Sequence, residues 1–483
     1  MQDSVPHFGS SINVEINGKA VDAQAPAAID LASPSSGQTV ARIDEADANV
    51  IDRAVAAAAA AFATHRKVSV AQRARWLTAA ADAMADARDE LVDLLISHVG
   101  KPRRLAEFEV ARSVQFVQLT AMELLTLRGE LLPLDAVDAG AGRLGFARRV
   151  PYGVVAGITP FNAPINLLVQ KLAPALAAGN AIVVKPALQG TAVALCVARA
   201  FARAGLPTGM LNVVAGGKDP ALALAAHPSV AAVTFTGGTM AGHALARAAG
   251  AKRFLAELGS NAANVVLADA DVASAAQRIA SAAFEAGGQQ CISAQRVIVA
   301  TEIFDAFLER FVAAAQKLRV GDPAEVSTDI GPLIHEGAAD RVIGLVEDAR
   351  ARGARIALAP TRSGATVSPA IVVDPPADAR ILHEEAFGPV VAVLRASSVD
   401  AALSLANDSQ FGLQGAVFTS SLEHAFRFAD DFDVGAMWVN EASRFRLDMY
   451  PFGGVKQSGV GREGVRYAID ELSQIKFVGI TPR

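Results

Sequence analysis

The chain has 483 residues, more than one hydrophobic core usually holds, so two or more domains are expected. Hydrophobic residues make up 52% and charged residues 19%, which excludes disorder as a description of the whole chain. The 44 basic and 49 acidic residues give a net charge of −5, so no nucleic-acid partner is predicted.

The N-terminus and the two cysteines indicate the cellular compartment in which the protein is expected. The first residues, MQDSVPHFGSS, are polar and carry an acid, unlike a signal peptide. Apolar segments are too short, or too interrupted by Arg, to span a bilayer, so no membrane partner is expected. Only two cysteines occur, Cys196 and Cys291, which argues against a disulfide framework and, without a His cluster, against a zinc site. We expect a cytoplasmic protein without a metal ion.

The first part of the chain is predicted to be helical after an irregular start. Residues 47–65 form an Ala-rich helix, and residues 69–99 form one helix that Ser69 caps and Gly100 ends. A third amphipathic helix covers about 104–128. Residues 142–150 then alternate apolar and polar side chains, which is typical of an exposed strand.

From Val154 onward, short apolar runs alternate with helical stretches. Helices are predicted near 166–179 and 190–204, and a second series with a helix at about 303–318 follows Gly259. This alternation is typical of parallel sheets, so the fold class is α/β.

Each cysteine is interpreted from its neighbours. Cys291 follows two glycines in FEAGGQQC, which allow a sharp turn beside the thiol. The local pattern leaves a nucleophile and a packing residue equally open. Cys196 lies in an apolar helical pattern and is expected to be a buried side chain.

Three further segments carry candidate functional residues. Glu257 ends a strand-like run in FLAELGSN, where a carboxylate is usually solvated or caps a helix. Asn162 lies in ITPFNAP, a rigid loop of the kind where α/β proteins place ligands, and its amide could also cap the next helix. Residues 233–242, VTFTGGTMAG, form a strand, a Gly-rich turn and a helix start that offers N–H groups to a phosphate.

Seven motifs follow one another along the chain: PFNAP at 160, KPA at 185, FTGGTMAG at 235, ELGS at 257, GQQC at 288, EEAFGP at 384 and PFGGVKQSGVGREG at 451. Their order and spacing resemble the aldehyde dehydrogenase family over nearly the whole chain. The resemblance implies a Rossmann-like NAD(P)-binding domain at 1–128 and 152–258 and an α/β catalytic domain at 259–465. It also implies a β oligomerisation arm at 129–151 and 466–483, and hence a homodimer or homotetramer.

The same resemblance implies a reaction, the oxidation of an aldehyde to a carboxylic acid with NAD or NADP. Cys291 would attack the aldehyde to form a thiohemiacetal, and Asn162 with the Cys291 N–H would form the oxyanion hole. Hydride transfer to the nicotinamide would leave a thioester, which water activated by Glu257 would hydrolyse. Glu257 would also help to deprotonate the thiol, whose ordinary pKa is about 8.5.

The resemblance also assigns cofactor contacts. Lys185 would hold the adenosine ribose, the turn at 236–238 the pyrophosphate, and the EEAFGP motif the nicotinamide ribose and ring. Relatives that prefer NAD often carry a Glu three residues after this lysine, where this chain has Leu188, so we expect NADP to be accepted. The implied cofactor residues are Pro160, Lys185, Thr236, Gly237, Gly238, Glu385 and Phe387.

The substrate is predicted from the tail signature FRLDMYPFGGVKQSGVGREG. It most resembles the branch acting on small oxygenated or anionic aldehydes, such as lactaldehyde and glyceraldehyde 3-phosphate. Arg112, Arg444 and Arg446 are the candidate cations for such a group, because the Arg fork pairs two oxygens at once. Gln290 stands where a phosphonoacetaldehyde enzyme would carry an arginine, so that substrate is disfavoured.

Four alternatives remain at this stage. The first is an aldehyde dehydrogenase for apolar or aromatic aldehydes. A CoA-acylating relative lacks the base that Glu257 supplies, and a cysteine hydrolase does not need the cofactor motifs. An inactive relative is disfavoured because Cys291, Glu257 and Asn162 are all present.

Overall fold

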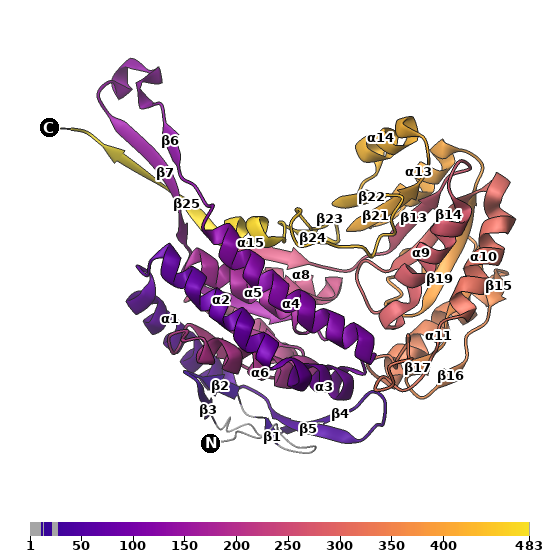
Figure 1. The fold of residues 1–483 in the computed structure, drawn as a ribbon, viewed down its shortest axis with the longest axis horizontal. Coiled ribbons are helices and arrows are strands. Elements are labelled where there is room, and N and C mark those ends of the chain that lie inside the picture. Colours follow the sequence, from indigo (N-terminus) through magenta and orange to yellow (C-terminus); the bar gives the residue numbers. More distant parts are fainter. Residues whose placement is uncertain (1–10, 13, 22–27, 483) are drawn as a thin grey trace.

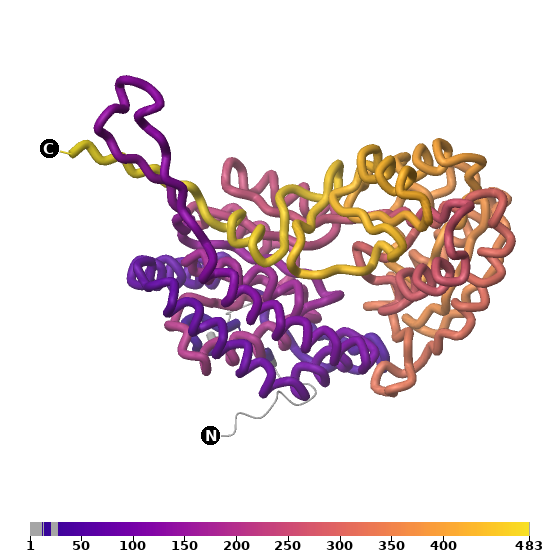
Figure 2. The backbone as a smooth tube through the Cα atoms, turned by 45° about the horizontal axis from the view of Figure 1, so that its top comes forward, coloured from indigo at the N-terminus to yellow at the C-terminus, as the bar shows by residue number. Residues whose placement is uncertain are grey.

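The computed structural model describes residues 11–12, 14–21 and 28–482. Figure 1 shows two α/β bodies side by side and a slender arm of strands projecting from the first body. The tube in Figure 2 shows that the C-terminal segment runs from the second body back across the first and then along the arm. The predicted α/β class therefore describes both bodies.

The first body is built on an eight-stranded sheet in the order β24-β12-β11-β8-β9-β10-β2-β3. Its five central strands, from β12 to β10, are parallel, as the alternation of strands and helices predicted. The outer strands β24, β2 and β3 pair antiparallel with their neighbours. The strands are β2 (Val14–Ile16), β3 (Lys19–Val21), β8 (Val154–Thr159), β9 (Ala181–Pro186), β10 (Leu211–Val213), β11 (Val230–Thr236), β12 (Arg253–Glu257) and β24 (Gly459–Val460).

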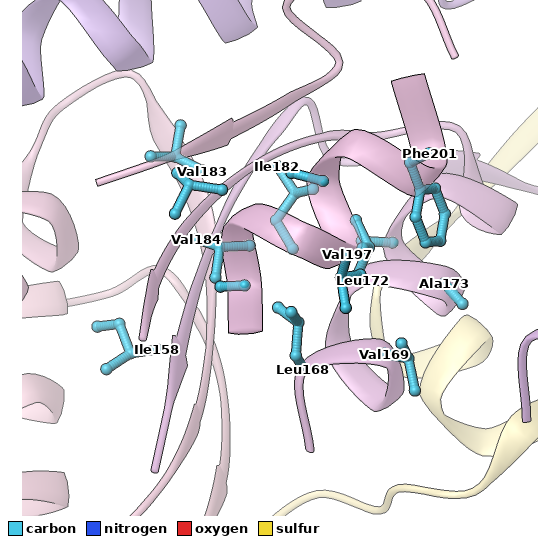
Figure 3. Packing of buried hydrophobic residues seen from close by; sticks show 14 of the residues in the cluster. Ile158, Leu168, Val169, Leu172, Ala173, Ile182, Val183, Val184, Val197 and Phe201 are labelled. Atoms are coloured by element: carbon cyan, nitrogen blue, oxygen red, sulfur yellow. The ribbon is translucent and has the colours of Figure 1, made fainter. Parts of the chain in front are cut away.

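Helices cover this sheet and form one large core with it. Figure 3 shows Ile182 and Val184 of β9 beside Leu168 of α5 and Val197 and Phe201 of α6, and all five are buried. The helices of this body are α1 (Ala48–His65), α2 (Val70–Asp86), α3 (Arg88–Val99), α4 (Arg103–Leu124), α5 (Asn166–Ala178), α6 (Thr191–Arg203), α7 (Lys218–Ala226), α8 (Thr239–Ala249) and α15 (Val465–Glu471).

The predicted helix over 69–99 is wrong in one respect, because the structure has two helices there. The ends are as predicted: Ser69 Oγ accepts a hydrogen bond from the Gln72 N–H, and Gly100 ends α3 with a left-handed φ of 71°. Between them Ala87 leaves the helical conformation. The Ala83 carbonyl near the end of α2 accepts a hydrogen bond from Arg203 of α6, so a tertiary contact accompanies the break.

The second body is built on a seven-stranded sheet in the order β15-β18-β19-β14-β13-β21-β22, in which only β15 is antiparallel. Its strands are β13 (Ala262–Val266), β14 (Ala294–Ala300), β15 (Arg355–Leu358), β18 (Ala370–Val373), β19 (Val390–Ala396), β21 (Gln414–Phe418) and β22 (Ala436–Val439). Its helices are α9 (Val272–Phe284), α10 (Phe304–Gln316), α11 (Glu336–Ala351), α12 (Arg380–His383), α13 (Val399–Asn407) and α14 (Leu422–Asp431).

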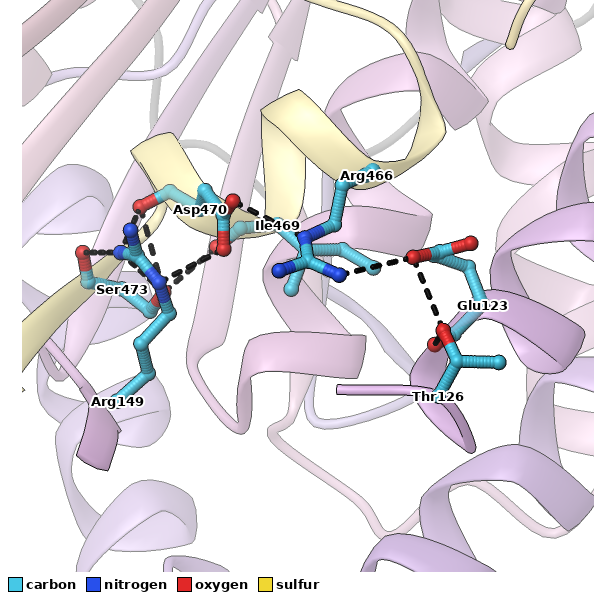
Figure 4. A network of polar contacts seen from close by, with 7 residues as sticks. All are labelled: Glu123, Thr126, Arg149, Arg466, Ile469, Asp470 and Ser473. Atoms are coloured by element: carbon cyan, nitrogen blue, oxygen red, sulfur yellow. Dashed lines mark hydrogen bonds and ion pairs between the residues drawn. The ribbon is translucent and has the colours of Figure 1, made fainter. Parts of the chain in front are cut away.

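The arm contains the strand expected at 142–150. β7 (Leu144–Pro151) pairs antiparallel with β25 (Ser473–Ile480) over eight positions and with β6 (Glu130–Leu132) on its other edge. Figure 4 shows how the base of the arm is fastened: Arg149 Nε lies 2.7 Å from the Asp470 carboxylate, and Arg466 bridges Asp470 and Glu123. The arm is therefore continuous with α4 and α15 of the first body.

Three small sheets complete the fold. β1 (Ser11–Ile12), β5 (Thr39–Asp44) and β4 (Ala28–Ala32) form one of them, in that order. The others are the pairs β16 (Arg362–Ser363) with β17 (Thr366–Val367) and β20 (Phe411–Gly412) with β23 (Val455–Lys456).

Candidate active site

The loop before Cys291 makes the sharp turn that its glycines predicted. After α9 ends at Phe284, Ala286, Gly287 and Gly288 adopt φ values of 55°, 62° and 67°. A side chain at Gly288 would overlap the carbonyl oxygen of Gly388, so this position requires glycine. The turn places Cys291 just before the amino end of β14, an inner strand of the second sheet.

Asn162 is tied to this turn. Its Nδ2 donates a hydrogen bond to the Gln289 carbonyl at 2.8 Å, which joins the PFNAP loop of the first body to the Cys291 loop of the second. Asn162 does not cap α5, because Glu109 Oε1 accepts the Ile165 and Asn166 N–H groups at 2.8 and 3.2 Å. The second N–H of the Asn162 amide has no acceptor within the described ranges.

Glu257 lies at the end of β12 with 1% of its surface exposed. Neither carboxyl oxygen has a hydrogen-bond partner among the residues described. Burial raises the pKa of Glu257 well above its ordinary value, and Glu463 acts in the same direction, against Arg446 and Lys171. This is neither a solvated carboxylate nor a helix cap, so the common interpretation of a Glu at a strand end does not hold.

A cluster of buried charges lies behind Glu257. Lys171 Nζ donates to Glu463 Oε1 at 2.8 Å and to Thr236 Oγ1 at 2.7 Å. Arg446 Nη2 donates to Glu463 Oε2 at 3.2 Å, and its guanidinium lies 3.6 Å from the centre of the Phe452 ring. Burial alone would raise the pKa of Glu463, but the two cations together hold it below its ordinary value.

Lys171 and Glu463 were not identified from the sequence. The available signal was a charged residue inside the apolar helix NLLVQKLAPALAA, since such a residue is seldom buried without a partner. The Thr236 hydroxyl, expected at the pyrophosphate, is hydrogen bonded to this cluster instead.

The two cysteines differ as expected in their surroundings. Cys196 is buried in α6. Cys291 is partly exposed, and its side chain packs against the small cluster of Ile292, Leu413 and Phe452, the last of which is the ring beneath Arg446. Desolvation raises the pKa of the Cys291 thiol to about 12, Arg446 opposes that rise, and Glu385 and Glu257 add to it. The resting thiol is therefore protonated at neutral pH.

A pocket of about 890 Å³ opens beside the cysteine loop, between α4, α9 and the loop at 441–449. Gln290 and the three arginines singled out from the sequence, Arg112, Arg444 and Arg446, all line it. Gln290 and Arg444, 154 positions apart in the sequence, are thus brought to one cavity.

Each arginine in this pocket already has a carboxylate partner. Arg112 donates from Nε and Nη2 to Asp448, and Arg444 donates to Glu285 at 2.6 Å and to Gln290 at 2.9 Å. Arg446 differs from the others because its buried Nε has no partner in the described part of the chain. Arg278 and Glu441, a further ion pair that the sequence did not indicate, also line the pocket.

The residues predicted to hold the adenosine end of a cofactor lie at the carboxyl edge of the first sheet. Lys185 of β9 is 7% exposed, and burial lowers its pKa to about 8, with Glu45 opposing that shift. Its ammonium group has no hydrogen-bond acceptor among the residues described. A side chain at Gly237 would clash with the Phe235 ring, whereas Gly238 faces open space at the start of α8.

The EEAFGP motif lies at the boundary between the bodies. Glu385 Oε1 accepts a hydrogen bond from the Ser260 N–H at 3.0 Å, and burial raises the pKa of Glu385 to about 7. Phe387 has a left-handed φ of 43° and meets Phe161, the neighbour of Pro160, edge to face at 5.9 Å. A buried lysine and an open glycine turn at the edge of the first sheet, with a buried carboxyl at the boundary between the bodies, fit an elongated dinucleotide.

Two kinds of feature are absent from the described residues. No group of three or more His, Cys, Asp or Glu side chains there could hold a metal ion. No helix within the described ranges is long and apolar enough to cross a membrane.

Residues 20–478 match the family model "Aldehyde dehydrogenase family". The chain belongs to the aldehyde dehydrogenase family. It is 39% identical over 442 residues to 3-sulfolactaldehyde dehydrogenase of Priestia aryabhattai, covering 91% of this chain and 92% of that protein.

Solved structures agree with this membership. An NAD-dependent aldehyde dehydrogenase of Sinorhizobium meliloti has a TM-score of 0.94 and 34% identity, over 100% of this chain and 97% of that one. The NADP complex of NADP-dependent glyceraldehyde-3-phosphate dehydrogenase of Bacillus halodurans has a TM-score of 0.95 and 32% identity, over 98% and 99%. The predicted family, α/β fold and enzyme class, an NAD(P)-dependent aldehyde dehydrogenase, are confirmed.

Proposed function

We propose that this aldehyde dehydrogenase oxidises small polar or anionic aldehydes to carboxylic acids through Cys291, Asn162 and Glu257. The observation that carries the proposal is the junction between the bodies. There the Asn162 amide bonds the cysteine loop, and the buried Glu257 carboxyl stands without a partner within the described ranges.

In the first step the Cys291 sulfur bonds to the aldehyde carbon, and the thiol proton passes to Glu257. Negative charge develops on the aldehyde oxygen, which the free Asn162 N–H and the Cys291 backbone N–H stabilise. One such donor contributes about 2.7–4 kcal/mol to transition-state stabilisation in other enzymes. Arg446 favours the sulfur anion, because its positive charge lowers the pKa of Cys291.

In the second half of the reaction a thioester on Cys291 is hydrolysed. Glu257 first releases the thiol proton to solvent and is then free to take a proton from a water molecule, whose oxygen bonds to the thioester carbon. The sulfur leaves as a thiolate and takes a proton back, which restores the Cys291 thiol. Behind Glu257 the buried Lys171–Glu463 pair supplies one charge of each sign, of which Lys171 favours the carboxylate form of Glu257.

NAD or NADP supplies the hydride acceptor when it is bound. Lys185 would hold the adenosine ribose, the turn at Gly237 and Gly238 the pyrophosphate, and Glu385 with Phe387 the nicotinamide half beside Pro160. The open turn at Gly238 and the free amine of Lys185 support this assignment.

The pocket supports a substrate that carries a negative or polar group. Sulfolactaldehyde and glyceraldehyde 3-phosphate, named for two of the similar proteins, are both small and anionic. Among the pocket arginines, Arg446 has a buried Nε donor free of any partner in the described residues. We therefore propose that this Nε donates a hydrogen bond to an oxygen of the substrate.

One observation favours an apolar or aromatic aldehyde instead. Phe108, Leu447 and Met449 line the same pocket and are each at least half exposed, so its outer part offers an apolar surface. The two candidates differ in which end of the pocket binds the substrate tail.

The test is the formation of reduced cofactor, followed by absorbance, with a panel of aldehydes. We expect kcat/KM for lactaldehyde, glyceraldehyde 3-phosphate or succinic semialdehyde to exceed that for hexanal and benzaldehyde. A tenfold preference for the apolar aldehydes would replace the first candidate by the second. Product formation that requires CoA would indicate an acylating enzyme.

We further propose that the arm joins subunits into a homodimer or homotetramer. Its strands expose Leu131, Ile475 and Phe477, and its outer edges have room for a further strand. We keep the division into a cofactor domain (1–128 and 152–258) and a catalytic domain (259–465) as a proposal, with β24 crossing into the first sheet. Because the thiol must stay free, we place the reaction in the cytoplasm.

A further inference from the structure

Glu45, in the segment between β5 and α1, lies against the carboxyl edge of the first sheet. Its Oε1 accepts a hydrogen bond from the Gly217 N–H at 2.5 Å, just before α7. The next residue, Ala46, donates its N–H to the Ala215 carbonyl at 2.9 Å. Two bonds on adjacent residues therefore hold Glu45 against the turn that follows β10.

This turn is shaped around the Glu45 side chain. Gly216 has a φ of 134°, and a side chain there would lie 2.7 Å from Glu45 Cγ. Since Gly216 lacks a side chain, the carboxylate can approach the turn closely. Its side chain is half-buried, so the carboxylate also borders open space at the sheet edge.

Lys185 lies at the same edge on the neighbouring strand. β9 and β10 are parallel, with Val184 opposite Val213, so Lys185 and the turn at 215–217 leave the sheet side by side. Burial lowers the pKa of the Lys185 ammonium, and Glu45 is the charge that opposes this shift. A cation and a carboxylate thus lie near each other at the end of the two strands, close enough for the charge of Glu45 to act on Lys185.

We propose that Glu45 binds the hydroxyl groups of the cofactor's adenosine ribose and makes this enzyme prefer NAD to NADP. The inference rests on the proposed function, in which Lys185 holds that ribose. A carboxylate at the adenosine ribose accepts hydrogen bonds from the hydroxyl groups and repels a 2′-phosphate. The sequence predicted NADP acceptance because Leu188 lacks a carboxylate, whereas Glu45 supplies one from a distant segment of the chain.

The simpler role for Glu45 is to fix the turn before α7. Glu45→Gln separates the two roles, because the amide oxygen can still accept the Gly217 N–H while the charge is lost. Asp219→Asn is the matched control: Asp219 is an exposed carboxylate in the first turn of α7, close to Gly217, and its change removes the same charge.

The experiment measures dissociation constants of NADH and NADPH by fluorescence, without aldehyde, for the full-length protein and both variants. We expect the parent to bind NADH at least about tenfold more tightly than NADPH, and Glu45→Gln to reduce that ratio about tenfold or more by tightening NADPH. Asp219→Asn should leave the ratio within about twofold of the parent.

Three results would overturn the inference: equal affinities in the parent, an unchanged ratio in Glu45→Gln, or an equal shift in Asp219→Asn. Equal affinities in the parent would show that no carboxylate excludes the 2′-phosphate of NADPH. The second would leave Glu45 with a role in the turn alone, and the third would indicate a general effect of charge near α7. If the parent binds neither nucleotide, the proposed function itself fails.

Discussion

The Arg112 guanidinium donates two hydrogen bonds to the Asp448 carboxylate, from Nε at 3.1 Å and from Nη2 at 2.7 Å. The pair joins α4 to the loop before the PFGG motif, and the Asp448 side chain is almost completely buried. Because the Arg112 guanidinium is paired with the Asp448 carboxylate through two hydrogen bonds, Arg112 fixes the pocket wall and does not present an unpaired charge to the substrate. Arg446 is therefore the stronger candidate for contact with substrate.

Arg446→Lys should lower kcat/KM for glyceraldehyde 3-phosphate and lactaldehyde by about tenfold or more, since lysine keeps the charge but loses the Nε donor. The value for hexanal should change much less. Steady-state kinetics on both kinds of substrate check this, with Arg444→Lys as the control on the same loop. An equal loss for hexanal would show that Arg446 acts on the catalytic groups and not on the substrate tail.

Cys291→Ala should abolish aldehyde oxidation and leave cofactor binding nearly intact, because the sulfur bonds the substrate and lies apart from the Lys185 edge. Absorbance follows the formation of reduced cofactor, and fluorescence measures the affinity for NADH. Cys196→Ala is the control, since that thiol is buried in α6. Residual activity above about a thousandth of the parent would remove Cys291 as the nucleophile.

Glu257→Gln should give a burst of reduced cofactor followed by a slow steady state, because the thioester forms but is not hydrolysed. In the parent the steady-state rate should rise with pH through the raised pKa of Glu257, since only the deprotonated carboxylate accepts a proton from water. Stopped-flow absorbance over a pH series tests both points. Equal rates for variant and parent at neutral pH would exclude Glu257 from the mechanism.

Glu463→Gln should destabilise the protein by about 3–5 kcal/mol, because Lys171 and Arg446 would stay buried without their counter-ion. The exposed pair of Arg350 and Glu347 provides the control, and Glu347→Gln should cost no more than about 0.5 kcal/mol. Denaturant unfolding compares the two variants. Equal midpoints would mean that the buried pair contributes no more than a surface pair.

Replacing both Ile475 and Phe477 by Asp should lower the molecular mass in solution, because like charges on the exposed arm would repel between subunits. Light scattering after size-exclusion chromatography measures the mass. Leu422→Asp, an exposed apolar position on α14, is the matched surface control. A parent that is already monomeric at micromolar concentration would contradict the proposed role of the arm.

Elements whose ends depend on local interactions were predicted well from the sequence. Ser69 and Gly100 act within one turn of their own helices, so their positions predicted a start and a stop. The break at Ala87 has no such signal, because Ala, Arg and Asp are all tolerated inside helices and the bond from Arg203 comes from 120 positions away.

In the candidate site, too, residues with a local sequence signal were predicted and residues placed by long-range contacts were not. Cys291, Asn162 and Glu257 lie in distinctive motifs and were singled out in advance, although their roles stay predictions. Glu45 and Glu109 lie in ordinary local sequence and bond to backbone N–H groups 172 and 56 positions away. The positions of such carboxylates follow from the assembled sheet and not from the neighbouring residues in the sequence. The prediction that NADP is accepted therefore rested on Leu188 and did not include Glu45.

The late position of Glu463 in the chain has a consequence for synthesis on the ribosome. Its partner Lys171 lies in the middle of α5 and has no other anion bonded to it in the described residues. β24, which covers the open edge of β12, is made just before Glu463. The first body therefore cannot neutralise Lys171 or cover β12 until translation has passed Glu463. A nascent chain that contains Cys291 but stops before β24 would lack both this counter-ion and the strand beside β12, at whose end Glu257 lies.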